Sequence, residues 1–249
     1  MSVSGKRVLV IMPAHNESGR IGVVIRGVRE ALPSADVVVV DDASTDATAH
    51  DAVAEGAMVL PHAVNMGYGA SLETAFLFAV RRGYEVVVQM DSDGQHLPGE
   101  LRALMGPLDS GEADIVIGSR YGKHDGGLRT PPFRRAGQLF FGTVLLVLTG
   151  RWFSDPTSGF QALNSRALGL FSSGVFPCDY PDADVLLMAH LAGLRIREVP
   201  VKMAPREGGV SIHAGWKPLY YGAKMLLSVF VVMLNDSVWR DWRRRLRAV

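Results

Sequence analysis

Two carboxylates stand one residue apart in residues 91–96 (Asp-Ser-Asp-Gly-Gln-His), directly after an apolar, strand-like run. Two acids at this spacing can reach one hard cation, and Gln95 offers a further oxygen. A Mg²⁺ or Mn²⁺ held in this way keeps positions open for diphosphate oxygens. Helix capping explains single acids at helix starts, but not a pair well ahead of the next helix. The segment therefore predicts a metal site made of Asp91, Asp93 and Gln95.

Two other polar segments follow apolar runs in the same manner. Residues 13–17 (Pro-Ala-His-Asn-Glu) come after the run Arg7–Met12, and residues 41–46 (Asp-Asp-Ala-Ser-Thr-Asp) come after Asp36–Val40. Ligands of open α/β sheets bind beyond the carboxyl ends of the strands. We therefore expect these two loops and residues 91–96 to gather into a single site at one edge of a sheet.

The elements that position these loops alternate between strand-like and helix-like patterns. Several of the apolar runs are almost continuous Val, Ile and Leu, which is typical of parallel strands buried on both faces. Short connections between alternating strands and helices favour an α/β fold with a doubly wound, mostly parallel sheet. The expected strands are Arg7–Met12, Asp36–Val40, Ala57–Leu60, Glu85–Met90 and Asp114–Gly118, and the expected helices are Ile21–Ala31, Thr45–Ala54, Ala70–Arg82 and Gly99–Met105.

The pattern changes after residue 118. A stretch rich in Gly, Pro and charge predicts a loop, and two strongly apolar helical segments follow further along. Five arginines and two tryptophans stand in the tail beyond the second of these helices. The expected segments are the loop Gly122–Pro132, the helices Ala136–Thr149, Ala183–Gly193 and Leu219–Leu234, and the strand Leu194–Met203.

The composition excludes several classes of protein. Lys plus Arg number 26 and Asp plus Glu number 25, so no overall basic field points to nucleic acid. A single cysteine rules out an internal disulfide and suits a reducing compartment. No uninterrupted apolar stretch reaches the roughly 20 residues that cross a bilayer as a helix. The sequence thus favours a cytoplasmic or peripherally attached enzyme.

Seven short motifs occur in a fixed order along the chain, and together they resemble one enzyme family. The motifs are residues 13–17, residues 41–46, Asn65-x-Gly67, residues 91–96, Gly118-Ser119-Arg120-Tyr121, Asp155-x-x-Ser158-Gly159-Phe160 and Glu198-Val199-Pro200-Val201. The chain resembles the family 2 glycosyltransferases of GT-A fold, and within them the dolichyl- and polyprenyl-phosphate mannose and glucose synthases. The resemblance covers about residues 7 to 213. It implies a catalytic domain over 1–213, with 214–249 as a C-terminal apolar helix and Arg/Trp-rich tail.

The resemblance implies a role for each matching position. Asp91, Asp93 and Gln95 would hold Mg²⁺ or Mn²⁺, with Asp93 as the direct ligand, while Asp91 leans toward the nucleotide. The base and ribose of the nucleotide-sugar would contact Pro13, Ala14, Glu17, Asp42, Asn65 and Gly67. The phosphates would be gripped by Arg120, by Arg134 or Arg135, and by Arg206 with Ser211. The segment containing Asp155, Ser158 and Gly159 would form the floor of the sugar and acceptor site.

The sequence leaves two kinds of acceptor open, a hydroxyl group and a lipid phosphate. Asp184, next to Asp182, matches the position where relatives that glycosylate hydroxyl groups carry an acidic general base. A lipid phosphate has a second pKa of about 6 and attacks without such a base, but it needs a cationic clamp. The arginines favour the phosphate. A soluble hydroxyl acceptor with Asp184 as base is the alternative, and a catalytically silent nucleotide-sugar-binding module is a third possibility.

The leading expectation is therefore an inverting transferase that moves a hexose from a UDP- or GDP-sugar to a polyprenyl phosphate. Leu219–Leu234 has only a thin polar stripe, and Trp239 and Trp242 follow it among arginines. Such a segment suits attachment to the cytoplasmic face of a membrane, although the same helix could instead cover the sheet.

Overall fold

The computed structural model describes residues 5–121, 132–177, 181–205 and 217–247. Within these residues helices and strands alternate through the first half of the chain, as the apolar patterns predict. The elements are β1 (Val8–Ala14), α1 (Ile21–Ala31), β2 (Asp36–Asp41), α2 (Thr48–Ala54), β3 (Met58–Pro61), α3 (Tyr68–Arg81), β4 (Val86–Gln89), the short 3₁₀ helix η1 (Pro98–Glu100), α4 (Leu101–Asp109), β5 (Ile115–Ser119), α5 (Pro132–Thr149), β6 (Gln161–Asn164), α6 (Ser165–Phe171), α7 (Ala183–Leu191), β7 (Ile196–Pro200), α8 (Lys217–Leu234) and α9 (Asp236–Arg247).

The described strands form one seven-stranded sheet in the order β3-β2-β1-β4-β6-β5-β7. β1 pairs in parallel with β2 and β4, and β5 pairs in parallel with β7. β6 runs antiparallel to both of its neighbours. The predicted α/β class with a mostly parallel sheet is confirmed. The sequence patterns did not predict β6, which has only four residues.

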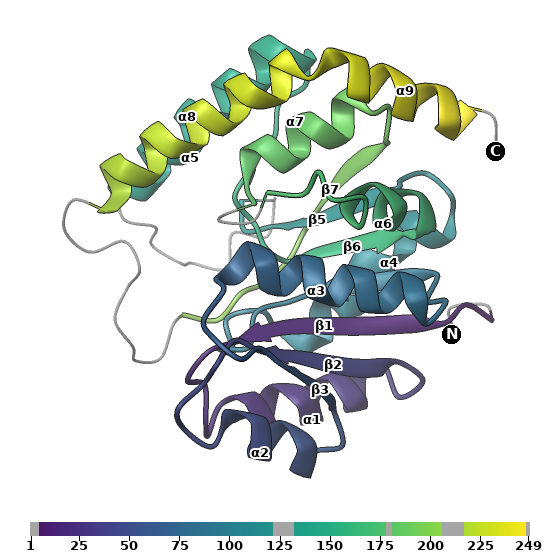
Figure 1. Ribbon diagram of the computed structural model, residues 1–249, viewed down its shortest axis with the longest axis vertical. Coiled ribbons are helices and arrows are strands. Elements are labelled where there is room, and N and C mark those ends of the chain that lie inside the picture. The colour runs from purple at the N-terminus through teal and green to yellow at the C-terminus, as the bar shows by residue number, and fades with distance from the viewer. Residues whose placement is uncertain (1–4, 122–131, 178–180, 206–216, 248–249) are drawn as a thin grey trace.

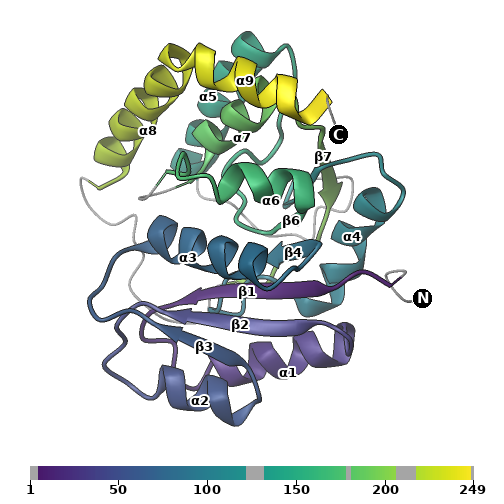
Figure 2. The same cartoon turned by 45° about the vertical axis from the view of Figure 1, so that its right-hand side comes forward.

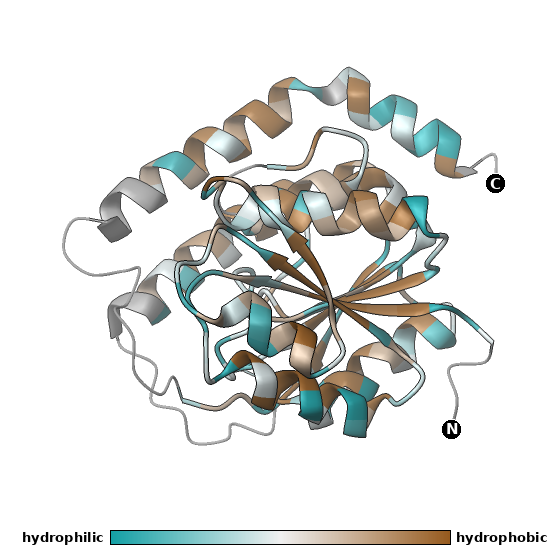
Figure 3. Cartoon of the chain, turned by 60° about the horizontal axis from the view of Figure 1, so that its bottom comes forward, coloured by the Kyte–Doolittle hydropathy of each residue, from teal (hydrophilic) through white to brown (hydrophobic). Residues whose placement is uncertain are grey.

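Both faces of the sheet are buried, which explains the continuous apolar strands. Along β1, Leu9 and Ile11 belong to one core cluster and Val10 and Met12 to the other, because successive side chains point to opposite faces. Helices α3, α6 and α7 cover the first face, and α1 and α4 cover the second (Figure 2). Figure 3 shows the apolar strands at the centre of the molecule.

Three further helices lie outside α7. α5, α8 and α9 each contact α7, so this side of the molecule has an additional helical layer (Figure 1). Trp239 of α9 is buried, its indole Nε1 donates to the carbonyl of Val232 at 2.6 Å, and Trp242 packs against the same core. The expectation that these tryptophans anchor the chain at a membrane is therefore wrong for Trp239. They form the apolar side of a helix that covers α7.

No single helix among the described residues is long and apolar enough to cross a membrane. Gly222–Leu234 and Ser237–Leu246 meet the length and hydropathy criteria only as a pair, and they are bent by 67° at the break between them.

Candidate functional site

The loops after β2 and β3 meet through hydrogen bonds centred on Asp42. The Asp42 carboxylate accepts the backbone N–H of Met66 at 2.7 Å and that of Gly67 at 2.8 Å, and His62 Nδ1 lies 2.8 Å from it. Burial raises the pKa of Asp42, but these hydrogen bonds outweigh burial and hold the pKa below its ordinary value. The sequence predicted that Asp42, Asn65 and Gly67 lie together. Asp42 achieves this by ordering the loop that contains the other two.

Pro13 and Ala14 are buried at the carboxyl end of β1, and both use their carbonyl groups to join neighbouring loops. Ser92 Oγ donates to the carbonyl of Pro13 at 2.8 Å, and the Asp42 amide donates to that of Ala14 at 2.8 Å. The Glu17 amide donates to Thr48 Oγ1 at 2.8 Å, and the Glu17 carboxylate pairs with Arg20. These contacts bring the loops after β1, β2 and β4 together, as the fold predicts.

Asp91 and Asp93 follow β4, and each carboxylate is held by a neighbouring side chain. Tyr68 OH donates to Asp91 Oδ1 at 2.9 Å. The Asp93 carboxylate accepts the backbone N–H of Gln95 at 3.0 Å and its side-chain Nε2 at 2.5 Å. Gly94 has φ +84° in the turn between them, a conformation that glycine adopts without strain. The carboxylates of Asp91 and Asp93 are therefore both held in fixed orientations next to a tight turn.

The residues present fit a hard divalent cation bound together with a substrate. No group of three or more His, Cys, Asp or Glu side chains in the described part of the chain is placed to hold a metal. Asp91 and Asp93 are both partly exposed and supply carboxylate oxygens. Mg²⁺ is typically bound by one or two carboxylates, with substrate phosphates and water completing its shell. Gln95 would contribute to such a site through its amide oxygen, because its Nε2 donates to Asp93.

Tyr68 is a site residue that the sequence did not reveal. Its hydroxyl group accepts from Gln89 Nε2 at 3.2 Å while it donates to Asp91. Burial, and then the charge of Asp91, raise the pKa of Tyr68 well above its ordinary value, so the phenol remains a donor. A Cβ on Gly159 would lie 2.8 Å from this hydroxyl oxygen. The resemblance implied that Gly159 lies in the floor of the sugar site. In the structure, the absence of a side chain at Gly159 makes room for the Tyr68 hydroxyl group.

His96 is buried beneath the acids rather than exposed to a ligand. Its Nδ1 accepts the backbone N–H of Asp91 at 2.8 Å, and its ring stacks on Phe160 with centroids 4.7 Å apart. Burial lowers the pKa of His96, which keeps the ring neutral with its proton on Nε2. The imidazole therefore supports the turn that carries Asp91.

Arg120, directly after β5, forms a bidentate ion pair with Asp155, which precedes β6. Arg120 Nε donates to Asp155 Oδ2 at 2.7 Å, and Nη2 donates to Oδ1 at 2.8 Å. Asp155 is fully buried, and Glu198 accepts its backbone N–H at 3.0 Å. Ser158 Oγ donates to the carbonyl of Gly118 at 2.6 Å, which joins the two loops. Asp155 therefore fixes the orientation of the Arg120 guanidinium, which is predicted to bind phosphate. The ion pair uses Nε and Nη2 of Arg120 and does not involve Nη1.

Asp182 and Asp184 at the start of α7 have different surroundings. Asp184 is 2% exposed, and its carboxylate accepts the N–H groups of Asp182 and Val185 and the hydroxyl of Ser228 from α8. Burial raises the pKa of Asp184 despite these hydrogen bonds. Asp184 thus serves as an anchor between α7 and α8.

Asp182 is the acid of this pair that lies nearer to the site. Burial, and then the charge of Asp184, raise the pKa of Asp182 to about 8, while the charge of Arg120 opposes them. The charges of Asp155 and Asp91 raise it further, which places Asp182 among the charged groups of the candidate site. The sequence analysis had instead assigned the acid of the acceptor site to Asp184, with Asp182 as its neighbour.

Several predicted phosphate-binding residues cannot be placed in this site. Arg206 and Ser211 lie outside the described residues, as do residues 122–131 of the predicted loop. The Arg134 side chain is also outside the described part, whereas Arg135 is exposed near the start of α5. Their roles stay predictions.

Known proteins resemble this chain over most of its length. Residues 9–169 match the model of the family described as glycosyl transferase family 2. The chain is 36% identical to the polyprenol monophosphomannose synthase of Mycolicibacterium smegmatis, over 84% of this chain and 82% of that protein. It is 33% identical to the undecaprenyl-phosphate mannosyltransferase of Micrococcus luteus, over 84% and 88% of the two chains.

Solved structures share the fold at lower sequence identity. A glucosyl-3-phosphoglycerate synthase from Mycobacterium tuberculosis, crystallised with Mn²⁺ and UDP-glucose, superposes with a TM-score of 0.63 at 24% identity. The match covers 91% of this chain and 78% of that chain. The same enzyme in complex with phosphoglyceric acid gives a TM-score of 0.65 at 23% identity, over 93% and 80% of the two chains.

Proposed function

This chain belongs to glycosyl transferase family 2, has the GT-A fold and is a glycosyltransferase, and we propose that it moves a hexose from a UDP- or GDP-sugar to a polyprenyl phosphate with inversion at the anomeric carbon. One observation carries the proposal. The strand-end site combines the partly exposed carboxylates of Asp91 and Asp93 with the Arg120 guanidinium, whose pKa is raised against the effect of burial by Asp155 and in part by the charge of Asp91. A cation held by the two acids and a guanidinium oriented by Asp155 suit a diphosphate and an anionic acceptor.

Asp91 and Asp93 would hold Mg²⁺ or Mn²⁺ on the donor side, as the Mn²⁺ complex of the structural neighbour suggests. Such a cation, when bound, neutralises the charge that develops on the departing nucleoside diphosphate. Tyr68 keeps Asp91 in one orientation, and the turn through Gln95 keeps Asp93 in another. The loop ordered by Asp42 would form the wall of the nucleotide pocket.

The acid at the start of α7 also supports a phosphate acceptor. With a pKa of about 8, Asp182 is mostly protonated at neutral pH, so it adds little repulsion against an incoming phosphate. Arg120, oriented by Asp155, would stabilise the attacking phosphate oxygen. A lipid phosphate is largely ionised at this pH and attacks without a base.

The alternative with a hydroxyl acceptor has weaker support. It assigns proton abstraction to Asp184, whose carboxylate is buried and takes three hydrogen bonds. The names of both relatives above refer to a polyprenyl-type acceptor, which agrees with a lipid phosphate as the acceptor of this chain. The silent binding module is set aside because the chain belongs to a family of transferases.

The test is transfer of labelled hexose from UDP- or GDP-sugars to undecaprenyl phosphate in the presence of Mn²⁺. We expect a lipid-linked product that EDTA abolishes and that Asp93→Asn reduces at least about 100-fold. Asp109→Asn is the matched control, because Asp109 is a surface acid of α4 that pairs with Lys6. Undiminished transfer by Asp93→Asn, or activity in EDTA, would refute the metal assignment. Transfer only to soluble hydroxyl acceptors would refute the lipid assignment.

A further inference from the structure

An apolar groove lies between α5 and α8, on the outer helical layer of the molecule. Its volume is about 380 Å³, within the range of roughly 300–1,000 Å³ that is usual for small-molecule pockets. Eight of its nine lining residues are apolar, and the hydroxyl of the ninth, Thr143, donates to the carbonyl of Leu139 at 2.7 Å. The groove therefore offers hydrocarbon surface and almost no polar group to a ligand.

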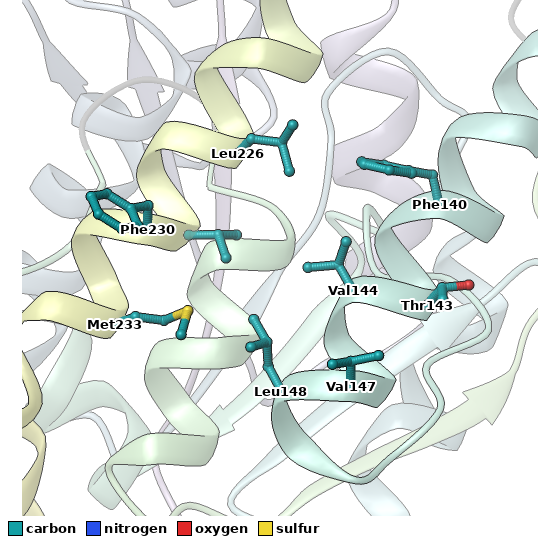
Figure 4. A pocket seen from close by; sticks show the side chains of 9 residues that line it. Phe140, Thr143, Val144, Val147, Leu148, Leu226, Phe230 and Met233 are labelled. Carbon is teal, nitrogen blue, oxygen red and sulfur yellow. The ribbon is translucent and has the colours of Figure 1, made fainter.

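The two walls of the groove are single faces of the two helices. On α5 the lining residues recur from Phe140 to Leu148, and on α8 from Leu226 to Met233, at spacings of three and four. Figure 4 shows Leu226 and Phe140 pointing toward one another across the groove. Phe140 on α5 and Phe230 on α8 both line the groove and are 50% and 56% exposed, an unusual degree for side chains of this size.

Both walls are connected to the acceptor side of the candidate site. Gln138 of α5 lies two residues before Phe140, and its Nε2 is 3.5 Å from Asp155 Oδ1. Ser228 of α8 lies beside the groove residue Val229, and its hydroxyl donates to Asp184 at 2.5 Å. The N-terminal ends of α5 and α8 lie on the same side of the molecule as the carboxyl end of β1 (Figure 1). The groove thus leads away from the site that would bind the phosphate.

We propose that this groove holds the first isoprene units of the acceptor, while the acceptor phosphate lies near Arg120. The inference rests on the proposed function, because it needs an acceptor that combines a phosphate with a hydrocarbon chain. A hydrocarbon chain matches this groove because eight of its nine lining side chains are apolar. Hydrocarbon burial then contributes to acceptor affinity in proportion to the chain length inside the groove.

The experiment measures KM for prenyl phosphates of two, three, four and six isoprene units, without vesicles and below their aggregation limits. For the unaltered protein we expect KM to fall at least about tenfold as the chain lengthens, and then to level off once the groove is filled. Phe140→Ser and Phe230→Ser should flatten this dependence by raising KM for the longer acceptors, with kcat and KM for the nucleotide-sugar donor changed less than about threefold. Both side chains are half exposed, so the fold should tolerate their loss, and thermal unfolding checks this.

Leu227→Ser is the matched control, because Leu227 is 62% exposed on α8 but does not line the groove. KM independent of chain length overturns the proposal, and so does an equal effect of Leu227→Ser. Length dependence that appears only with added vesicles assigns the surface to the bilayer instead. A dimer that Phe230→Ser dissociates assigns it to a second copy of this chain. Failure of every prenyl phosphate as acceptor refutes the proposed function itself, which is a separate result.

Discussion

Tyr68 holds the Asp91 carboxylate in space that exists only because residue 159 is glycine. The phenol donates to Asp91 Oδ1, and a Cβ on Gly159 would lie 2.8 Å from its oxygen. The sequence motifs contain Asp91 and Gly159, but nothing in them connects Tyr68 to a carboxylate 23 positions away. Residues that touch substrate occur in recognisable motifs, whereas their supports depend on contacts that only the folded chain creates.

Loss of the Tyr68 hydroxyl should weaken cation use more than folding. A hydrogen bond to a charged group contributes about 1.5–3 kcal/mol, so Tyr68→Phe should raise the Mn²⁺ concentration for half-maximal transfer by roughly tenfold or more. Tyr84→Phe, which removes a hydroxyl that donates to Asp36, is the matched control. Titration of the initial rate with Mn²⁺ measures the effect. An unchanged Mn²⁺ requirement would mean that the Tyr68–Asp91 contact has no part in binding the cation.

The pH dependence of stability should identify Asp182 as the perturbed acid. Its pKa of about 8 in the folded protein lies above the value of about 3.9 in an unfolded chain. The folded state therefore binds a proton that the unfolded state has lost, and stability falls as the pH rises from about 4 to about 8. Asp182→Asn should remove this decline, so that its melting temperature exceeds that of the unaltered protein by several degrees at pH 8 but not at pH 4.5.

Metal-free protein and differential scanning fluorimetry are suited to this measurement. Asp184→Asn provides the contrast, because it removes charge from an acid that accepts three hydrogen bonds and joins α7 to α8. That variant should lower the melting temperature at pH 8. Equal behaviour of the two variants would contradict the distinct roles assigned to the two acids.

Elements with a clear apolar pattern could be predicted from the sequence, including the four-residue strands β3 and β4, whereas β6 could not. Helix α1 matches its expected bounds, and β1, β2 and α8 differ by only a few residues, because apolar spacing determines them. β6 has four residues and no pattern of its own, and its direction follows from pairing with β4 and β5. α9 was expected as an arginine-rich tail. It forms a helix because Trp239 and Trp242 share a face that packs on α7.

Three elements at the far edge of the sheet depend on one buried acid. Asp114, just before β5, is fully buried and accepts hydrogen bonds from Arg195 near the start of β7, from Asn164 at the end of β6 and from Arg166 of α6. Burial disfavours its charge, but Arg195 and then Asn164 and Arg166 lower the pKa of Asp114 to about 2. The stabilisation is therefore complete above about pH 4 and is lost as the pH falls toward 2.

Asp114→Ala should destabilise the protein by about 2–4 kcal/mol at pH 7, because Arg195 and Arg166 lose their buried partner. The difference from the unaltered protein should shrink below pH 4. Urea unfolding at several pH values measures it, with Asp109→Ala as a surface control expected to change stability by less than about 1 kcal/mol. KM for donor should be unchanged, since Asp114 lies at the opposite edge from the site. A pH-independent difference would contradict the assigned charge state.

The outer helical layer of the molecule combines an apolar surface with a basic one. Exposed apolar side chains concentrate on α5 and α8, whereas α9 is largely hydrophilic (Figure 3). On α8, Leu227, Val231 and Leu234 are 62%, 47% and 68% exposed outside the groove. Arginines of α9 are exposed nearby, and one of them, Arg244, pairs with Asp241. An apolar surface beside basic residues is the arrangement of proteins that bind at a lipid interface.

We therefore predict that the protein binds vesicles containing anionic lipid, through α8 rather than through the tryptophans of α9. Leu227→Ser combined with Val231→Ser should lower the partition coefficient at least about tenfold in a co-sedimentation assay, because each buried CH₂ contributes about 0.8 kcal/mol. Val23→Ser is the control, since Val23 is 60% exposed on α1, across the sheet from α8. Added salt should weaken binding only in part, because the exposed arginines supply the screened component and α8 supplies the rest. Binding that survives the double substitution, or that salt abolishes entirely, would assign attachment to the arginines alone.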